Sequence, residues 1–156
     1  MAQILVVDDE IGIRELLSEI LAVEGHQVML AESAGDARRL RERGRPDLVL
    51  LDIWMPDTDG ITLLKEWAAS GQLTMPVVMM SGHGTIETAV EATRIGALDF
   101  LEKPIALQKL LASVKKALRA EPQARRHAAS LKDFSRIKSL HDFARRLEQA
   151  ARRAPV

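Results

Sequence analysis

The sequence predicts an α/β fold in which five parallel strands form one doubly wound sheet with helices on both faces. Short apolar runs alternate with helical patterns between residues 1 and 120. Most of these runs are continuously apolar, which is typical of strands covered on both faces. Alternating strands and helices imply right-handed crossovers, and such crossovers produce a parallel sheet. The predicted strands are Ile4–Val7, Val28–Ala31, Leu48–Leu51, Val77–Met80 and Leu98–Leu101.

Apolar residues at the period of an amphipathic helix follow the first, third, fourth and fifth of these strands. The second helix is predicted to begin at Ser33, with Asp36 three residues later, a spacing that resembles a capping box. Thr85 is the expected cap of the fourth helix, and Gly96 is its expected stop. Pro122 is predicted to end the fifth helix.

Composition limits the classes of function. The chain of 156 residues is long enough for one domain with a full core and an extension. It contains no cysteine, which excludes disulfides, a thiol nucleophile and a thiolate metal site. No apolar run approaches the roughly 18 residues of a membrane span, and the N-terminus lacks a signal-peptide pattern. We therefore expect a cytoplasmic protein that makes no membrane contact.

The formal net charge of zero hides an asymmetry between two parts of the chain. Residues 1–120 hold 13 lysines and arginines against 18 aspartates and glutamates, whereas residues 121–156 hold 9 against 4. The acidic part cannot bind nucleic acid by charge alone, because such binding depends on neutralised phosphates. The arginines of the basic part alternate with apolar residues, which is more typical of a solvated linker or helix face. The basic part could contribute weakly to such binding, and contact with DNA is expected only through domains absent from this chain.

Polar residues follow four of the five predicted strands. In open parallel sheets, functional sites form beyond the carboxyl ends of the strands, where the strand order reverses. The first strand is followed by two carboxylates and the third by one, while a hydroxyl and a lysine follow the fourth and fifth: Asp8, Asp9, Asp52, Ser81 and Lys103. Because an isolated buried carboxylate is costly, something positive is expected to bind among them.

These side chains suit metal-assisted phosphoryl transfer. Mg²⁺ takes oxygen ligands, commonly one or two carboxylates with waters and phosphate oxygens. Asp9 and Asp52 are the candidate ligands, with Asp8 acting directly or through water. An aspartate can also attack phosphorus and form an aspartyl phosphate. Lys103 is expected to neutralise the phosphoryl group and Ser81 to hydrogen-bond it, because such catalysis consists mostly of positioning and charge neutralisation.

Four segments resemble the receiver domain of bacterial two-component response regulators. They are Val6–Glu10, Leu51–Gly60, Met80–Gly84 and Asp99–Pro104, and their combined order and spacing are specific. The resemblance covers roughly residues 3–119 and implies the flavodoxin-like strand order 2-1-3-4-5. It also implies a phosphoacceptor switch that takes its phosphate from a sensor histidine kinase, rather than an enzyme acting on a separate substrate.

The resemblance implies a phosphoacceptor and a metal site. Asp52 matches the phosphoacceptor. Asp9 and Asp52 match the direct Mg²⁺ ligands, with Asp8 in support and the backbone carbonyl of Trp54 as a further ligand. Lys103 matches the lysine that pairs with the phosphate.

The resemblance also implies a switch. Ser81 and Phe100 match the two residues that respond to phosphorylation, although the family often has tyrosine at the second position. The bond between Lys103 and Pro104 is expected to be cis, which X-Pro bonds adopt at low cost. The face formed by the fourth helix, fifth strand and fifth helix is expected to change its partner preference, with a homodimer as the output.

The competing class is an Mg²⁺-dependent phosphatase with an aspartate nucleophile. Such enzymes commonly place a second acid two residues after the nucleophile, where this chain has Trp54. A flavodoxin-like cofactor binder is a third class, but Trp54 is its only candidate aromatic residue at the site. The segment Asp57–Gly60 resembles a calcium loop only superficially, because the first aspartate of that motif falls at Met55.

The C-terminal extension is expected to comprise a linker at 121–136 and an amphipathic helix at 137–156. Its apolar residues keep a coiled-coil-like spacing over only two heptads, fewer than a coiled coil needs. The receiver motifs are most similar to the nitrogen-regulation branch of regulators that activate sigma-54 RNA polymerase. An AAA+ ATPase follows the receiver there, so 137–156 is expected to begin a truncated ATPase module. The chain has no Gly-x-x-x-x-Gly-Lys-Ser/Thr loop for ATP.

Overall fold

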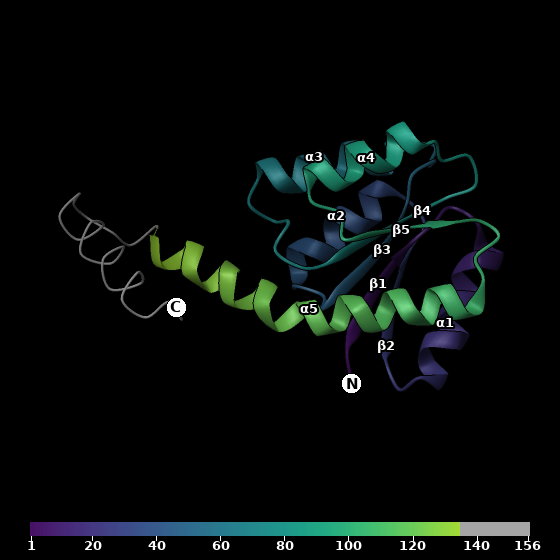
Figure 1. Ribbon diagram of the computed structural model, residues 1–156, viewed down its shortest axis with the longest axis horizontal. Coiled ribbons are helices and arrows are strands. Elements are labelled where there is room, and N and C mark those ends of the chain that lie inside the picture. Colours follow the sequence, from purple (N-terminus) through teal and green to yellow (C-terminus); the bar gives the residue numbers. More distant parts are fainter. Residues whose placement is uncertain (135–156) are drawn as a thin grey trace.

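Five strands and five helices alternate along the described chain (Figure 1). The computed structural model describes the backbone of residues 1–134 and the side chains of residues 1–126. The strands are β1 (Gln3–Val7), β2 (Gln27–Ala31), β3 (Leu48–Asp52), β4 (Val77–Ser81) and β5 (Asp99–Glu102). The helices are α1 (Ile11–Val23), α2 (Ala34–Arg43), α3 (Gly60–Ala69), α4 (Ile86–Ile95) and α5 (Leu107–Phe134). Every predicted strand is confirmed, with bounds that differ by at most one residue at either end.

The strands form one parallel sheet in the order β2-β1-β3-β4-β5, as the resemblance implies. Because β1 lies between β2 and β3, the strand order reverses beside β1 and β3. Val7 pairs with Leu51 at the carboxyl ends of these two strands, and Asp52 pairs with Met80 of β4. The residues that follow β1 and end β3 therefore lie at the same edge of the sheet.

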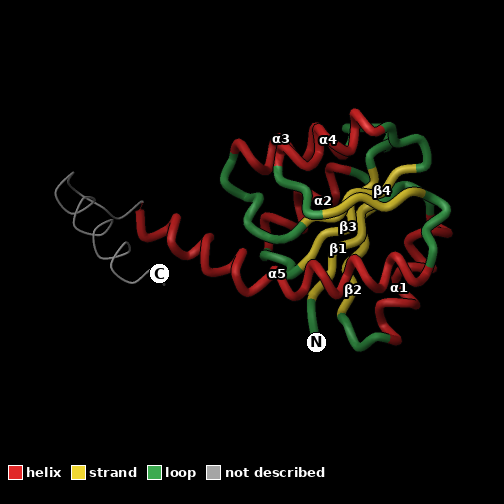
Figure 2. The backbone as a smooth tube through the Cα atoms, in the orientation of Figure 1, coloured by secondary structure: helices red, strands yellow, loops and turns green. Residues whose placement is uncertain are grey.

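Apolar layers cover both faces of the sheet. Helices α2, α3 and α4 lie on one face, and α1 and α5 lie on the other (Figure 1 and Figure 2). Alternate residues of β3 divide between the two layers: Val49 and Leu51 pack in the cluster that contains Trp67, whereas Leu48 and Leu50 pack in the other cluster. Burial on both faces explains why a continuous apolar run forms a strand here.

Helices α2, α3 and α4 begin at side-chain caps. In each, a side-chain oxygen accepts a backbone N–H from the residue three positions later: Ser33 from Asp36, Asp59 from Thr62 and Thr85 from Thr88. Gly96 ends α4 with a φ of 138°, a conformation that glycine adopts without steric cost. The predicted caps at Ser33 and Thr85 and the predicted stop at Gly96 are confirmed.

Helix α5 continues through Pro122 to Phe134 and extends beyond the rest of the domain (Figure 1). The prediction that Pro122 ends the helix is therefore wrong, and the first part of the expected linker at 121–136 is helical. Among the described helices, including this one, none has an apolar stretch long enough to cross a membrane. The helix expected at 137–156 lies outside the described residues.

Ion pairs on both sides of Pro122 explain why the helix continues. Glu121 pairs with Arg45 at 2.5 Å, and Arg125 pairs with Asp47 at 2.8 Å. Both partners lie just before β3, so the two pairs hold consecutive turns of α5 against the domain. This tertiary anchoring offsets the backbone hydrogen bond that proline cannot donate.

Candidate functional site

The carboxyl edge of the sheet brings the predicted polar residues together. Asp52 and Ser81 are the last residues of β3 and β4, whereas Asp8 and Lys103 directly follow β1 and β5. Asp8, Asp52 and Ser81 are buried, but Asp9 is exposed. These residues come from four strands and are far apart in the sequence, so only the parallel sheet places them at one edge.

The ammonium of Lys103 joins the two buried aspartates. Its Nζ lies 2.7 Å from Oδ2 of Asp8, 3.3 Å from Oδ1 of Asp52 and 3.8 Å from Oε1 of Glu10. Among the described residues, Oδ2 of Asp8 has no other hydrogen-bond partner. A single ammonium therefore faces three carboxylates, and we call Asp8, Asp9, Glu10, Asp52 and Lys103 the acidic site.

Asp52 retains its proton to a pH far above the usual range for an aspartate. Burial, the largest influence, and the charge of Asp8 raise the pKa of Asp52 from 3.8 to about 7, although Lys103 opposes the rise. Desolvation lowers the pKa of Lys103, but its hydrogen bond with Asp8 and the charge of Asp52 outweigh desolvation, so this pKa is raised. Near neutral pH, Asp52 is therefore divided between its protonated and ionised forms. A second cation at the acidic site would favour the ionised form, which is the nucleophilic one.

The loop after β1 arranges three acidic residues. Oδ1 of Asp8 accepts the backbone N–H of Glu10 at 2.9 Å, and Nη1 of Arg14 donates to the carbonyl of Asp8 at 2.7 Å. Carboxylate oxygens of Asp8, Asp9 and Glu10 all lie within 4.8 Å of one another. Sequence reasoning assigned no role to Glu10 or Arg14, because a charged residue at the start of a surface helix is a weak signal.

This oxygen cluster fits a hard divalent cation, because Mg²⁺ prefers carboxylate oxygens. The single ammonium of Lys103 faces three carboxylates, so the site carries an excess of negative charge. Asp9 belongs to the cluster, together with Asp8 and Glu10. Asp52 is outside that cluster and is linked to it through Lys103. Trp54 follows in the β3–α3 loop with its side chain exposed.

Ser81 and Lys103 are fixed side by side at the ends of β4 and β5. The N–H of Lys103 donates to the carbonyl of Ser81 at 2.8 Å, and the Ser81 hydroxyl accepts the N–H of His83 at 3.1 Å. The peptide bond between Lys103 and Pro104 is cis, as the resemblance implies. The Ser81 hydroxyl is thus held by the loop that follows β4.

Phe100 lies half-buried on β5 and packs against the apolar cluster beneath α2, α3 and α4. Its ring is also next to Gly84, in the loop that follows Ser81. The two predicted switch residues, Ser81 and Phe100, therefore both contact the loop between β4 and α4.

Gly60 lets α3 begin directly against the end of β3. Its N–H donates to the carbonyl of Ile53 at 2.7 Å. A Cβ at this position would overlap the backbone carbonyl of Asp52, so no larger residue fits without moving the strand end. Nothing in the segments Leu51–Gly60 and Asp57–Gly60 predicts this close approach, because it depends on the folded structure.

Asp57 has a structural role. Its carboxylate accepts the N–H groups of Ala34 and Gly35 at 3.2 and 2.9 Å, at the start of α2. Desolvation raises the pKa of Asp57, but backbone hydrogen bonds, from Gly35, Thr58 and Ala34 among others, outweigh it and lower the pKa below the ordinary value. The carboxylate thus ties the β3–α3 loop to α2, in agreement with the rejection of a calcium loop at Asp57–Gly60.

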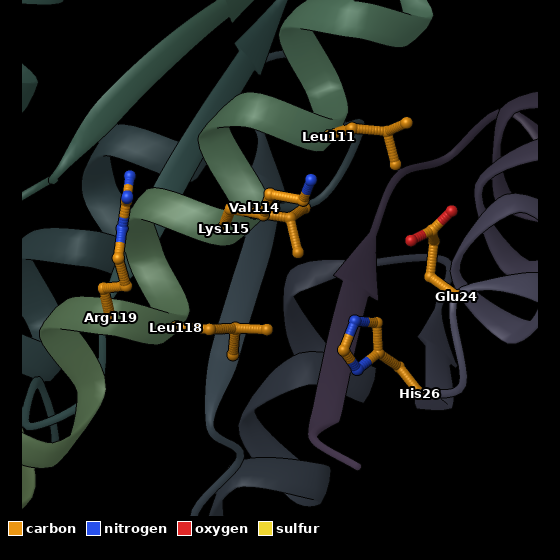
Figure 3. Close-up of a pocket in the computed structure, with 7 residues that line it drawn as sticks. All are labelled: Glu24, His26, Leu111, Val114, Lys115, Leu118 and Arg119. Atoms are coloured by element: carbon orange, nitrogen blue, oxygen red, sulfur yellow. The ribbon is translucent and has the colours of Figure 1, made fainter.

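A separate hollow of about 440 Å³ lies between the end of α1 and helix α5 (Figure 3). Glu24 and His26 line one side, and five residues of α5 line the other: Leu111, Val114, Lys115, Leu118 and Arg119. His26 comes directly before β2, so the hollow lies at the amino edge of the sheet. It shares no residue with the acidic site at the carboxyl edge.

Comparison with known proteins identifies the family to which the chain belongs. The family model described as the response regulator receiver domain matches residues 4–115. The chain belongs to this receiver family. The receiver is 41% identical over 119 residues to the regulatory protein AtoC of Escherichia coli K12, covering 76% of this chain and 26% of that protein. It is 40% identical over 134 residues to the nitrogen assimilation regulatory protein NtrX of Azorhizobium caulinodans, covering 85% of this chain and 29% of that protein.

A solved structure gives the same result. The receiver domain of NtrX from Brucella abortus is 47% identical, with a TM-score of 0.69, over 74% of this chain and 98% of that chain. The present receiver spans less than a third of the length of AtoC and of Azorhizobium NtrX. It is therefore similar to one part of these regulators, and the predicted resemblance to a receiver is confirmed.

Proposed function

We propose that the receiver accepts a phosphoryl group on Asp52 from the phosphohistidine of a sensor kinase. The P–N bond to the histidine breaks, a P–O bond to the Asp52 carboxylate forms, and the departing imidazole takes a proton from water. The observation that carries the proposal is the ammonium of Lys103 within 3.3 Å of Asp52. This ammonium is placed to neutralise phosphoryl oxygens as they arrive, which is how such transfers are catalysed.

Mg²⁺ is the metal that we infer for the acidic site. Asp9 and Asp52 would hold it, with Asp8 in support and the backbone carbonyl of Trp54 as a further ligand. The carboxylate cluster around Asp9 supports this assignment. When bound, the ion supplies positive charge to the phosphoryl oxygens. Lys103 supplies a second positive charge.

Ser81 and Phe100 are the proposed switch. We infer that the Ser81 hydroxyl leaves the N–H of His83 to hydrogen-bond the new phosphoryl group, and that the ring of Phe100 moves with it. Exposed apolar residues on α4 and α5 support an output on these helices: Ile86, Val90 and Leu107. A homodimer through this face is the proposed output.

We further propose that the receiver controls transcription as part of a longer regulator. The names of the matched regulators, and a coverage of less than a third of their length, support this inference. The receiver motifs favour a sigma-54 activator in which an ATPase module follows. Contact with DNA would then come from segments outside this chain.

An aspartate-nucleophile phosphatase has no support from the site. The position two residues after Asp52 holds Trp54, which is 58% exposed and has no acidic group. A leaving alcohol would lack a proton donor at this place. We therefore infer that Asp52 stores the phosphoryl group.

The proposal is tested by intact mass after incubation with acetyl phosphate and Mg²⁺. We expect the wild type to gain one phosphoryl group and Asp52→Asn to gain none. Asp59→Asn is the matched control, because its amide oxygen still accepts the N–H of Thr62 at the start of α3 and its NH2 group can donate to the Thr62 hydroxyl, so it should gain the same mass as the wild type. Labelling that persists in Asp52→Asn would place the phosphoryl group elsewhere.

A further inference from the structure

Gly84 lies where the ring of Phe100 and the side chain of Ser81 meet. A Cβ placed on Gly84 would stand 2.5 Å from Cζ and 2.8 Å from Cε1 of Phe100. The same Cβ would stand 3.3 Å from Cβ of Ser81. Carbon atoms that are not bonded rarely approach closer than about 3.5 Å, so a methyl group cannot share this place with the ring.

The backbone of Gly84 itself would accept a side chain. Among the described residues, glycines with positive φ occur at positions 25, 71 and 96, and Gly84 is not one of them. Alanine at position 84 would therefore carry no backbone strain, and its only serious conflict is with the ring. The conflicting atoms are at the far end of the Phe100 side chain, which rotation about χ1 can carry away.

We propose that Gly84 is the positioning residue for Phe100. Its missing side chain admits the ring to the half-buried place beside Ser81, and any larger residue at position 84 turns the ring outward. Position 84 thereby sets which surface β5 presents between α4 and α5. The consequence for signalling rests on the proposed function, in which Phe100 responds to a phosphoryl group on Asp52.

The proposal separates phosphorylation from its readout. The three atoms nearest to a methyl group at position 84 belong to Phe100 and Ser81, and none of them belongs to the acidic site. Gly84→Ala should therefore still accept the phosphoryl group on Asp52. Its ring, however, would already be outside and could no longer change place when Ser81 moves.

Fluorine NMR of protein labelled with 4-fluorophenylalanine tests this inference. The chain has three phenylalanines, so the spectrum has three resonances, and Phe100→Leu identifies the one from Phe100. Gly82→Ala is the matched control, because its nearest contact would be Cβ of Lys103 at an ordinary 3.9 Å. Spectra are recorded before and after addition of acetyl phosphate and Mg²⁺.

In Gly84→Ala we expect the Phe100 resonance alone to shift toward its position in the unfolded protein and to stop responding to acetyl phosphate. Gly82→Ala should keep the wild-type spectrum and response. An unshifted Phe100 resonance in Gly84→Ala would overturn the proposal. Intact mass on the same samples keeps the two ideas apart, because a ring shift without labelling refutes the proposed function and leaves the role of Gly84 standing.

Thermal unfolding gives a second measurement in case Gly84→Ala folds poorly. The clash requires a full ring at position 100, so Gly84→Ala/Phe100→Leu should unfold at the same temperature as Phe100→Leu alone. The contrary result is a double variant that unfolds at a lower temperature than Phe100→Leu, by as much as Gly84→Ala lowers the unfolding temperature of the wild type. That result would show that the methyl group does not clash with the ring.

Discussion

Lys103 lies closer to Asp8 than to Asp52, with its Nζ 2.7 Å from Oδ2 of Asp8 and 3.3 Å from Oδ1 of Asp52. Before phosphorylation the lysine is therefore chiefly the counter-ion of a fully buried carboxylate. A phosphoryl group on Asp52 would bring new oxygens to the same ammonium. Lys103 thus has two tasks, the stability of the resting receiver and the neutralisation of its phosphate.

Lys103→Met should destabilise the metal-free receiver by on the order of 3 kcal/mol, because it leaves Asp8 buried without its counter-ion. Urea unfolding in EDTA measures this loss. The double variant Asp8→Asn/Lys103→Met removes the stranded charge and should recover part of the stability. A single variant as stable as the wild type would show that the ion pair contributes nothing to folding.

The stability of the metal-free receiver should fall as pH rises from about 4 to about 7. The unfolded chain holds the Asp52 proton with an ordinary pKa of 3.8, whereas the folded receiver holds it with a pKa of about 7. The folded state therefore binds more protons in this window, and ionising Asp52 costs up to about 1.4 kcal/mol per pH unit. Urea unfolding at a series of pH values gives the slope.

Asp52→Asn isolates this effect from the other titrating groups. The amide does not ionise, so the decline in stability attributed to Asp52 should disappear and the variant should be the more stable protein at pH 7. Parallel stability curves for the wild type and the variant between pH 4 and 7 would argue against a raised pKa at this position.

Gly60→Ala should destabilise the receiver by about 2–3 kcal/mol and slow phosphorylation, because its methyl group would overlap the backbone carbonyl of Asp52. Gly12→Ala is the control. Gly12 lies in α1 with nothing within 4 Å of its added Cβ, so alanine there should stabilise the receiver by about 0.5 kcal/mol. If the two substitutions change the stability and the rate of phosphorylation equally, the close approach at Gly60 is not the cause of these changes.

Arg45→Ala should lower the free energy of unfolding by on the order of 2 kcal/mol, because Arg45 and Glu121 form a largely buried ion pair beside Pro122. Arg125→Ala removes the pairs with Asp47 and Glu121, but the Arg125 side chain is 59% exposed, so the loss of stability should stay within about 1 kcal/mol. Chemical denaturation compares the two. A larger loss of stability in Arg125→Ala than in Arg45→Ala would show that α5 is not anchored through Arg45.

The fold could be predicted from the sequence because its buried apolar runs are also its strands. Leu48–Leu51 is covered on both faces, so four consecutive apolar residues predict a strand with little ambiguity. Helix α5 could not be predicted as well, because Pro122 is a strong local stop signal. The contacts that overcome it, from Arg45 and Asp47, join residues that are distant in the sequence.

The site, like the fold, has some features that the sequence predicts and others that depend on contacts between distant residues. The positions of Asp8, Asp52, Ser81 and Lys103 follow from strand ends in a parallel sheet, so the sequence predicts that they meet. The preference of Lys103 for Asp8, and the need for glycine at position 60, depend on differences of less than 1 Å. Such distances are set by packing of the whole domain, which no local pattern encodes.

The central claim, that Asp52 stores a phosphoryl group, is tested most directly by following protein-bound and free phosphate in one sample. The receiver is labelled with acetyl phosphate and Mg²⁺ and freed of the donor. Intact mass then reports the phosphoprotein while inorganic phosphate is assayed over time. We predict one phosphoryl group per chain, absent in Asp52→Asn, that is lost slowly and only once. In a parallel sample that keeps the donor, release of many phosphates per chain without an accumulated phosphoprotein would contradict storage and identify a phosphatase.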